Sequence, residues 1–415
     1  MSRPPPPAAP THLLRSHSDS ISALWISEDN ERIYSGDSSG KVVATSTRSL
    51  RAITLWNPHS DSILGVEEFG PHIITHGRDN KLHVWNFIKE PPASTRLGGS
   101  AALPDLPIPT LAYSLDVNAL NYCRFSLLSL GTINGNEFSA IIALPNLVDS
   151  STADIWSLPE GDRLHAAVGQ ETNKPVFATN PDSGRIIMSL HIYVSPEDRG
   201  PTLPAVPTTS LRLLCAYESG SVALRRYTRP ERPVSIEGQG WEVLWKTKSH
   251  VETVMAMSVS RANTFALTVS ADHLLSKYEL SDLESKTIVH RTKYPGNSSI
   301  AIRDDGKVCA VGGWDGSIRL YSTKSFKPLG TLRYHKTNCQ TLAFAHSTIK
   351  QKDGGKGEVP AERGPTIEDE DGDEDDEMSA SDKEAISRWL VAGGKDSRLS
   401  VWTLMSFEST PSAQP

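Results

Sequence analysis

Four side chains at fixed spacing mark one short stretch of this chain of 415 residues. Asp79 stands four residues after Thr75 and six before Trp85, and His59 precedes all three. Parts of the same pattern return further along the chain, at Thr268, Asp272 and Tyr278, at Asp315 and Tyr321, and at Asp396 and Trp402. A pattern that recurs predicts a chain built from repeats, and this constrains the fold more than any local propensity does.

The repeated unit is predicted to be a small antiparallel sheet. Each copy of the pattern lies among short runs of β-branched and aromatic residues, which Gly, Asp, Asn and Ser separate. A His, a Ser or Thr, a turn Asp and a strand Trp at this spacing are typical of WD-type β-propellers. There they hydrogen-bond across one blade and hold its strands in register. We therefore predict that His59, Thr75, Asp79 and Trp85 form a structural tetrad.

Alignment of the turn position gives seven repeats, at Ser39, Asp79, Asn134, Ser219, Asp272, Asp315 and Asp396. The predicted fold is therefore all-β, a seven-bladed WD-repeat β-propeller. Only one strand follows the last turn, so residues 11–17 are expected to supply the outer strand of blade seven and close the ring. The strands of blade three are expected at 119–125, 127–136, 137–144 and 154–159.

The polar set is expected to decay from blade to blade. Blade two keeps all four members. Blades five and seven keep part of the set, as His250, Thr268, Asp272 and Tyr278 in the first and His335, Ala392, Asp396 and Trp402 in the second. Ala392 takes the Ser/Thr position of blade seven and cannot accept or donate a side-chain hydrogen bond.

Composition divides the chain into one folded domain and three tails or insertions. Residues 1–10 are rich in proline and are predicted to be disordered, and residues 406–415 form a C-terminal tail. The propeller is expected to span 11–405, with a disordered acidic insertion at about 349–385 inside blade seven. Residues 368–377 of that insertion hold nine acids in ten positions, which is too polar to bury a core.

Charge and cysteine usage exclude several classes of protein. The formal net charge is −7, and without the nine acids of 368–377 it is −7 + 9 = +2. A near-neutral folded part does not predict a sequence-specific nucleic-acid surface. The four cysteines include no CxxC pair, which indicates buried thiols in a reducing compartment. We expect no secretory signal and no membrane span.

Motifs that resemble catalytic or metal sites all have a structural alternative. Residues 36–40 read GDSSG, with Ser38 as the potential nucleophile, but the strand-like run that follows favours a hairpin turn over a hydrolase elbow. His72 and His76 are four residues apart without a third ligand, so no metal site is predicted. No cofactor is predicted either.

Two exposed charged features are candidates for partner contact. The run of Arg225, Arg226, Arg229 and Arg232 could contact phosphate or an acidic partner, although a solvated strand edge is the simpler interpretation. The acidic block 368–377 is either a solubilising loop or a tail for basic partners such as histones. Ser381 precedes Asp382 and Glu384, a context that suits an acid-directed kinase.

The chain resembles one family, the fungal ASTRA-associated protein 1 family of seven-bladed WD-repeat proteins, which is related to G-protein β-subunit-like proteins of animals. The resemblance covers residues 11–404. The segments that carry it are RSHSDSISALWI, THGRDNKLHVWN, DIWSLP, LLCAYESGSVALRRY and LVAGGKDSRLSVW. The family has no catalytic residues to carry over.

The resemblance implies a nuclear subunit of the multisubunit ASTRA assembly, with the cytoplasm as a second compartment. That assembly is linked to chromatin remodelling and to maturation of phosphatidylinositol-kinase-related kinases with triple-T cochaperones. The residues by themselves predict less, namely a non-catalytic protein–protein scaffold. The alternatives are a histone- or nucleosome-binding propeller that uses its acidic loop, and a hydrolase at Ser38.

Overall fold

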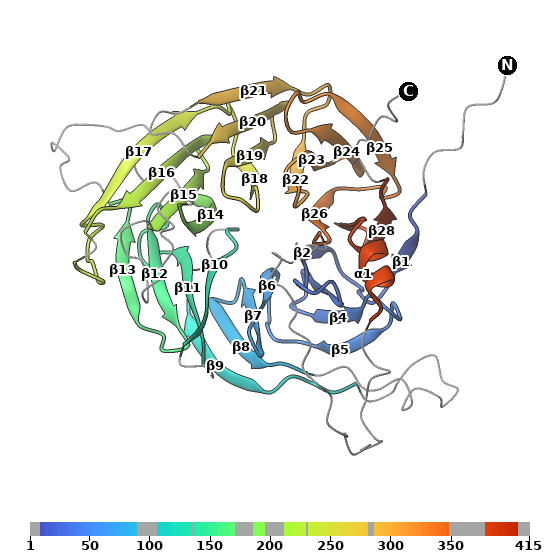
Figure 1. Cartoon of the computed structure of the whole chain (residues 1–415), viewed down its shortest axis with the longest axis horizontal. Helices are drawn as coiled ribbons and strands as arrows, with labels where there is room; N and C mark the ends of the chain where they lie inside the picture. Colours follow the sequence, from blue (N-terminus) through green and yellow to red (C-terminus); the bar gives the residue numbers. More distant parts are fainter. Residues whose placement is uncertain are drawn as a thin grey trace, which may run out of the picture.

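The computed structural model describes residues 9–88, 106–118, 120, 122–133, 137–170, 186–195, 211–229, 231–280, 286–347 and 378–405. In these residues, seven four-stranded antiparallel sheets stand radially around a common axis (Figure 1). Within each sheet the strands lie side by side in order from the axis outward. This arrangement is a seven-bladed β-propeller, and it confirms the fold predicted from the repeats.

Blades one and two each contain four strands in chain order. Blade one contains β2 (Ile21–Ile26), β3 (Arg32–Asp37), β4 (Val42–Ser46) and β5 (Ala52–Trp56). Blade two contains β6 (Ile63–Phe69), β7 (His72–Gly77), β8 (Lys81–Asn86) and β9 (Leu111–Asp116). The middle strands β3 and β7 are buried on both faces over most of their length, which explains why their sequences show no regular apolar–polar alternation.

Blade three corrects the predicted strand assignment. It contains β10 (Ser126–Ile133), β11 (Glu137–Pro145), β12 (Ala153–Leu158) and β13 (Arg163–Val168). Residues 122–125 form no strand, so the predicted first strand is wrong and each later one moves inward by one place. Asn134 therefore lies in the connection between the first and second strands, outside the described residues, and is not the turn residue of this blade. The sequence does not predict the outer strand β13, because its segment RLHAAV contains no turn residue of the repeated pattern.

Blades four to six each contain four strands in chain order. Blade four contains β14 (Ile187–Val194), β15 (Leu211–Tyr217), β16 (Ser221–Tyr227) and β17 (Trp241–Lys248). Blade five contains β18 (Val254–Val259), β19 (Phe265–Ser270), β20 (Leu274–Glu279) and β21 (Thr287–Arg291). Blade six contains β22 (Asn297–Ile302), β23 (Val308–Gly313), β24 (Ser317–Ser322) and β25 (Pro328–Arg333).

Blade seven joins the two ends of the propeller. It contains β26 (Cys339–Phe344), β27 (Trp389–Gly394), β28 (Leu399–Thr403) and, as its outer strand, β1 (His12–Leu14). The pairing is antiparallel, with Leu13 opposite Ser400 and Leu14 opposite Leu399. Figure 1 shows β1 in blue beside β28 in red. The predicted closure by an N-terminal strand is confirmed.

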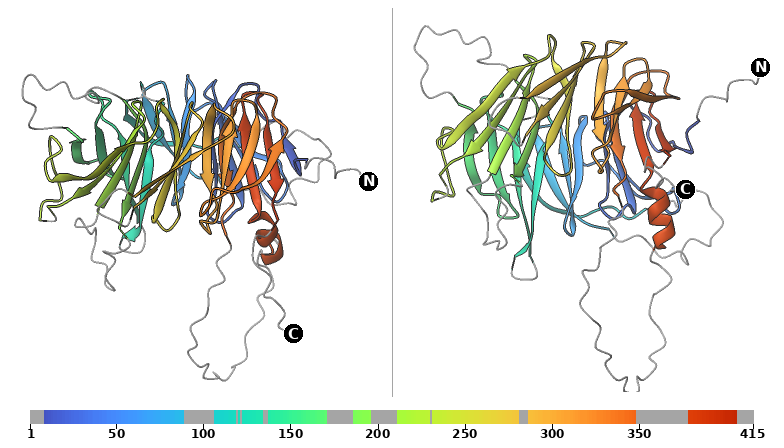
Figure 2. Two further views of the ribbon diagram at one scale, coloured as in Figure 1. Left: turned by 90° about the horizontal axis from the view of Figure 1, so that it is seen from above. Right: turned by 45° about the horizontal axis from the view of Figure 1, so that its top comes forward.

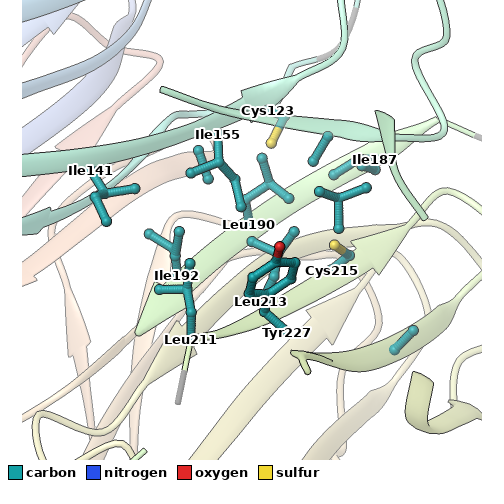
Figure 3. Packing of buried hydrophobic residues seen from close by; sticks show 14 of the residues in the cluster. Cys123, Ile141, Ile155, Ile187, Leu190, Ile192, Leu211, Leu213, Cys215 and Tyr227 are labelled. Carbon is teal, nitrogen blue, oxygen red and sulfur yellow. The ribbon is translucent and has the colours of Figure 1, made fainter. Parts of the chain in front are cut away.

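The hydrophobic core is divided among the contacts between neighbouring blades. Seven clusters of buried side chains occur, and each draws its members from two adjacent blades. Figure 3 shows the one between blades three and four, where Cys123, Ile155, Leu190 and Leu213 pack together. A blade therefore buries its two faces only against its two neighbours, and the fold is stable as a ring rather than as separate sheets.

The end of the predicted acidic insertion is ordered. Residues up to 385 were expected to be disordered, but α1 (Ala380–Ile386) follows the N-cap Ser379, whose hydroxyl accepts a hydrogen bond from the Asp382 N–H. Met378 and Ile386 are buried in the cluster between blades seven and one. Figure 2 shows α1 projecting from one face of the ring. Two apolar anchors flanking a polar run explain why composition alone placed this boundary too late; residues 348–377 lie outside the described residues.

Charged side chains from four blades meet on the face from which the insertion leaves. Arg261 of blade five donates to Glu28 of blade one at 2.6 Å and to Asp304 of blade six at 3.2 Å. His346 of blade seven has its Nδ1 at 2.7 Å from the Arg261 guanidinium, and the N–H of Ser347 donates to Asp304 at 3.0 Å. The cluster links blades that are not neighbours in the ring, and it fixes His346 and Ser347, which directly precede the predicted insertion.

Among the described residues, no helix has the length and apolar character needed to cross a membrane.

We expect removal of β1 to open the ring. A protein that lacks residues 1–14 should expose the edge of β28, which is a template for pairing with other chains. It should elute as soluble aggregate in size-exclusion chromatography, whereas a protein that lacks residues 1–8 should elute as the parent does. Identical elution of the two truncated proteins would contradict closure by β1.

We expect α1 to contribute to stability through its apolar anchor. Ile386→Ala should lower the free energy of unfolding by about 2–3 kcal/mol, the usual effect of truncating a buried aliphatic side chain. Glu384→Ala, on the exposed side of the same helix, is the matched control and should leave the denaturation midpoint unchanged. An equal midpoint for both variants would show that α1 does not pack on the propeller in solution.

Candidate protein-interaction site

The predicted tetrad of blade two is assembled as expected. His59 Nδ1 lies 2.8 Å from the Asp79 carboxylate, and His59 Nε2 lies 2.9 Å from Thr75 Oγ1. The indole N–H of Trp85 donates to the same Thr75 oxygen at 2.9 Å. Asp79 also accepts from the N–H of Ser60 at 3.0 Å. These hydrogen bonds therefore connect the loop before β6 to the second and third strands of the blade, β7 and β8.

Burial determines the charge state of this network. Desolvation lowers the pKa of His59 below its ordinary value despite the attraction of Asp79, so the imidazole is neutral at pH 7. Burial tends to raise the pKa of Asp79, but the Ser60 N–H and His59 outweigh it, and that pKa is lowered. A neutral His59 donates through Nδ1 to Asp79 and accepts from Thr75 through Nε2. The hydrogen bonds therefore all donate in one direction, from Trp85 through Thr75 and His59 to Asp79.

Blade one contains a network that the sequence analysis missed. His17 lies 2.7 Å from Asp37 and 2.8 Å from Ser35 Oγ. Ser39, which was aligned as the turn residue, donates to Asp37 at 2.6 Å instead of replacing it. The repeated string HSDSI, at 17–21 and at 59–63, was the available signal.

The order of Ser, His and Asp in blade one matches a catalytic triad, but the site is closed. Ser35 and Asp37 are fully buried, with exposed fractions of 0%, so no substrate reaches the hydroxyl. Ser38, the potential nucleophile of GDSSG, lies in the turn between β3 and β4. Ser38 therefore lies in a hairpin turn, as the favoured interpretation of GDSSG predicts. It is not part of the His17–Asp37 pair.

Blades five and seven complete their networks in different ways. In blade five, His250 lies 2.7 Å from Thr268, which is 3.2 Å from the Tyr278 hydroxyl. In blade seven, Ser400 accepts from Trp402 at 2.9 Å and lies 2.9 Å from His335 Nε2. Ser400 is the cross-strand partner of Ala392, so the hydroxyl has moved from the second strand to the third.

Turn glycines connect the networks of blades two, five and seven to the blade before each. A Cβ on Gly40, Gly220 or Gly316 would lie 2.0–2.3 Å from the carbonyl oxygen of the tetrad histidine of the next blade. All three glycines have positive φ, between +75° and +91°. The close approach allows His59 to donate its N–H to the Gly40 carbonyl and His250 to donate to Gly220. The loops on this face are therefore held rigidly.

The tetrad face, defined as the blade-to-blade loops and the turns between second and third strands, carries most of the exposed apolar loop residues. The large apolar side chains exposed there are Leu120, Tyr122, Leu147, Val148, Val251, Tyr294 and Trp314. Val148 is 94% and Leu120 76% exposed. Apolar and aromatic side chains on a rigid surface are typical of protein–protein contact sites.

Two arginine side chains make cation–π contacts with exposed tyrosines of the tetrad face. The Arg78 guanidinium lies 4.5 Å from the ring centroid of Tyr122, and the Arg319 guanidinium lies 4.5 Å from that of Tyr294. Arg319 also donates to Asp315 at 2.5 Å. A partner would therefore meet preformed aromatic–cation pairs at little cost in side-chain entropy.

The remaining sequence candidates do not form a further site on this surface. His76 is fully buried on β7 next to Phe125, and no group of three metal-ligating side chains occurs among the described residues. The four arginines of 225–232 do not share one surface, because Arg225 is buried whereas Arg226 is half-exposed and lies 3.6 Å from Glu242. Ser381 is exposed on α1; its modification stays a prediction.

We expect the blade-two network to be structural. Asp79→Ala should leave His59 Nδ1 and the Ser60 N–H without their acceptor, which costs about 1–3 kcal/mol in free energy of unfolding. Thermal denaturation followed by circular dichroism measures this. Asp61→Ala changes an exposed carboxylate in the same loop and should melt with the parent. If Asp79→Ala also melted with the parent, the structural assignment would be wrong.

We expect His76 to make stability depend on pH. Burial lowers the pKa of His76 to about 3 from 6.5, so between these values the unfolded chain binds a proton that the folded chain does not. Stability should therefore fall as the pH falls below 6.5. His76→Leu should reduce the loss between pH 7 and pH 5 by about 2 kcal/mol.

Urea titrations at the two pH values test this. The exposed His273→Leu is the control and should keep the full loss. A loss in His76→Leu equal to that of the parent would show that His76 does not titrate as proposed.

Comparison with known proteins agrees with this architecture. A family model described as WD domain, G-beta repeat, matches residues 290–322. Two fungal proteins named ASTRA-associated protein 1 are similar over almost the whole chain. The one from Verticillium alfalfae is 30% identical over 95% of this chain and 92% of its own length, and the one from Aspergillus niger is 29% identical over 96% and 98%.

The similarity extends to an animal protein. Guanine nucleotide-binding protein subunit beta-like protein 1 of the mouse is 23% identical over 96% of this chain and 97% of its own length. The fungal match reaches 30% identity with both proteins covered almost end to end. On this evidence the chain belongs to the ASTRA-associated protein 1 family.

Proposed function

We propose that this protein is a non-catalytic scaffold that joins the subunits of an ASTRA-type assembly. The observation that carries the proposal is the tetrad face, a rigid surface with exposed aromatic and aliphatic side chains. The hydrogen-bonded networks beneath it hold loops in place without offering a reactive group to solvent. The names of the fungal relatives supply the assembly.

The cellular role follows from the family resemblance. We assign the protein to the nucleus, with the cytoplasm as a second compartment. We assign it to chromatin remodelling and to maturation of phosphatidylinositol-kinase-related kinases together with triple-T cochaperones. A scaffold suits both duties, because each requires that large proteins be held in a defined arrangement.

A second function rests on the acidic run 368–377. Nine acids in ten residues would attract a basic partner such as a histone tail, and such binding would weaken steeply with salt. This function requires the insertion, whereas the scaffold function requires the tetrad face. Replacement of the nine acids by Asn and Gln therefore separates the two.

Affinity purification of the tagged protein from its native cells tests the scaffold function. We expect subunits of an ASTRA-type assembly to copurify. The double variant Tyr122→Ala, Trp314→Ala should recover at least about tenfold less of them, since aromatic anchors carry most interface energy. Val243→Ala, on the outer strand β17, is an exposed apolar control and should recover as much as the parent.

The purification has two informative negative results. Recovery of histones alone, lost when the acids are replaced, would favour the second function. Recovery that does not change in the double variant would show that the tetrad face is not the contact surface.

A further inference from the structure

Blade four replaces the tetrad with residues of different chemistry. In blade two, Ile73 pairs with Trp85 across β7 and β8. In blade four, Leu213 pairs with Arg225 across β15 and β16 in the same register. Arg225 therefore occupies the place of the tetrad tryptophan. Cys215 stands where Thr75 does, four residues before the turn, and Ser219 stands in place of Asp79.

The substitution buries a guanidinium. Arg225 has an exposed fraction of 7%, and its Nε and Nη1 have no hydrogen-bond partner among the described residues. The Tyr217 side chain beside it is also buried, and the centroid of its ring lies 5.8 Å from Arg225 Cζ. Two donors thus lie close together between blades three and four, where the neighbouring cluster is apolar (Figure 3).

No described group neutralises this charge. No carboxylate oxygen of a described residue forms an ion pair with Arg225, whereas the adjacent Arg226 lies 3.6 Å from Glu242. Burial raises the pKa of the Cys215 thiol in spite of the attraction of Arg225, so Cys215 stays neutral. Burial likewise raises the pKa of Tyr217. A guanidinium buried without a carboxylate partner is destabilising, and an oxyanion would remove this cost.

The backbone above the guanidinium leaves little room. A Cβ on Gly169 would lie 3.2 Å from Nη2 and 3.3 Å from Cζ of Arg225. Gly169 has φ +103°, a conformation that favours glycine. The end of β13 therefore packs closely over Arg225, and the ligand has to be small and flat.

We propose that Arg225 and Tyr217 form a receptor for one carboxylate group between blades three and four. A carboxylate matches the planar fork of a guanidinium and accepts two parallel hydrogen bonds from it. The tyrosine hydroxyl is positioned as a further donor. The carboxylate belongs to an acidic side chain of a partner protein, so this part deepens the scaffold function and rests on it, whereas the receptor itself does not.

Binding of free acetate to the isolated protein tests the receptor. At matched ionic strength, acetate in place of chloride should raise the melting temperature of the parent by about 2 °C at concentrations several times its Kd. Arg225→Met should abolish this rise. Arg226→Met, the adjacent half-exposed arginine, should keep it.

The same variants distinguish a receptor from simple packing. Without acetate, Arg225→Met should melt at or above the temperature of the parent, because it removes an unpaired buried charge while keeping much of the side-chain volume. A lower melting temperature for Arg225→Met together with no effect of acetate on the parent would overturn the proposal. An acetate effect that survives in Arg225→Met would also overturn it, as it would arise elsewhere.

Copurification identifies the source of the carboxylate. If it comes from a partner side chain, Arg225→Met should lose one copurifying protein that Arg226→Met retains. Equal recovery in both variants, with acetate binding intact in the parent, would assign the site to a free small carboxylate instead. Failure of the scaffold function leaves the acetate result unaffected, because that experiment uses the isolated protein.

Discussion

Burial of each blade against its two neighbours is the constraint on which the rest of this structure depends. A four-stranded sheet with two apolar faces cannot be stable alone, and here each face finds its cover only in the next blade. The last interface, between blades seven and one, includes Leu14 of β1, the three-residue strand that pairs with β28. A short strand at one end of the chain thus stabilises seven sheets, because it turns a stack with two open ends into a ring.

The polar networks make the two faces of this ring different. They lie at one end of the blades, where His59, His250 and His335 each link an entering loop to two strands. The loops above them are held in place and can present aromatic side chains without a large entropic cost on binding. The opposite face is different, since charged residues of four blades meet there and hold Ser347, just before the acidic insertion.

Blades with weak sequence patterns are not weaker parts of the fold. Blade four lacks the tetrad, yet every residue of β15 is buried. Its interface with blade three depends on apolar packing and on Arg225. Because blade four has lost the tetrad, its tetrad positions no longer have that structural role. The same positions can therefore keep a buried charge for a ligand.

Sequence spacing determined the repeat, the number of blades, the tetrad of blade two and the closing strand, because strand alternation and turn chemistry are local and leave a periodic record. It failed for blade three, where the turn signal at Asn134 lies on the wrong side of a strand. Tertiary structure alone decided that Asp37 and Ser400 complete networks, that Met378 and Ile386 anchor a helix, and that Arg225 is buried. These outcomes depend on which side chains meet across strands and blades, and such contacts join positions far apart in the chain.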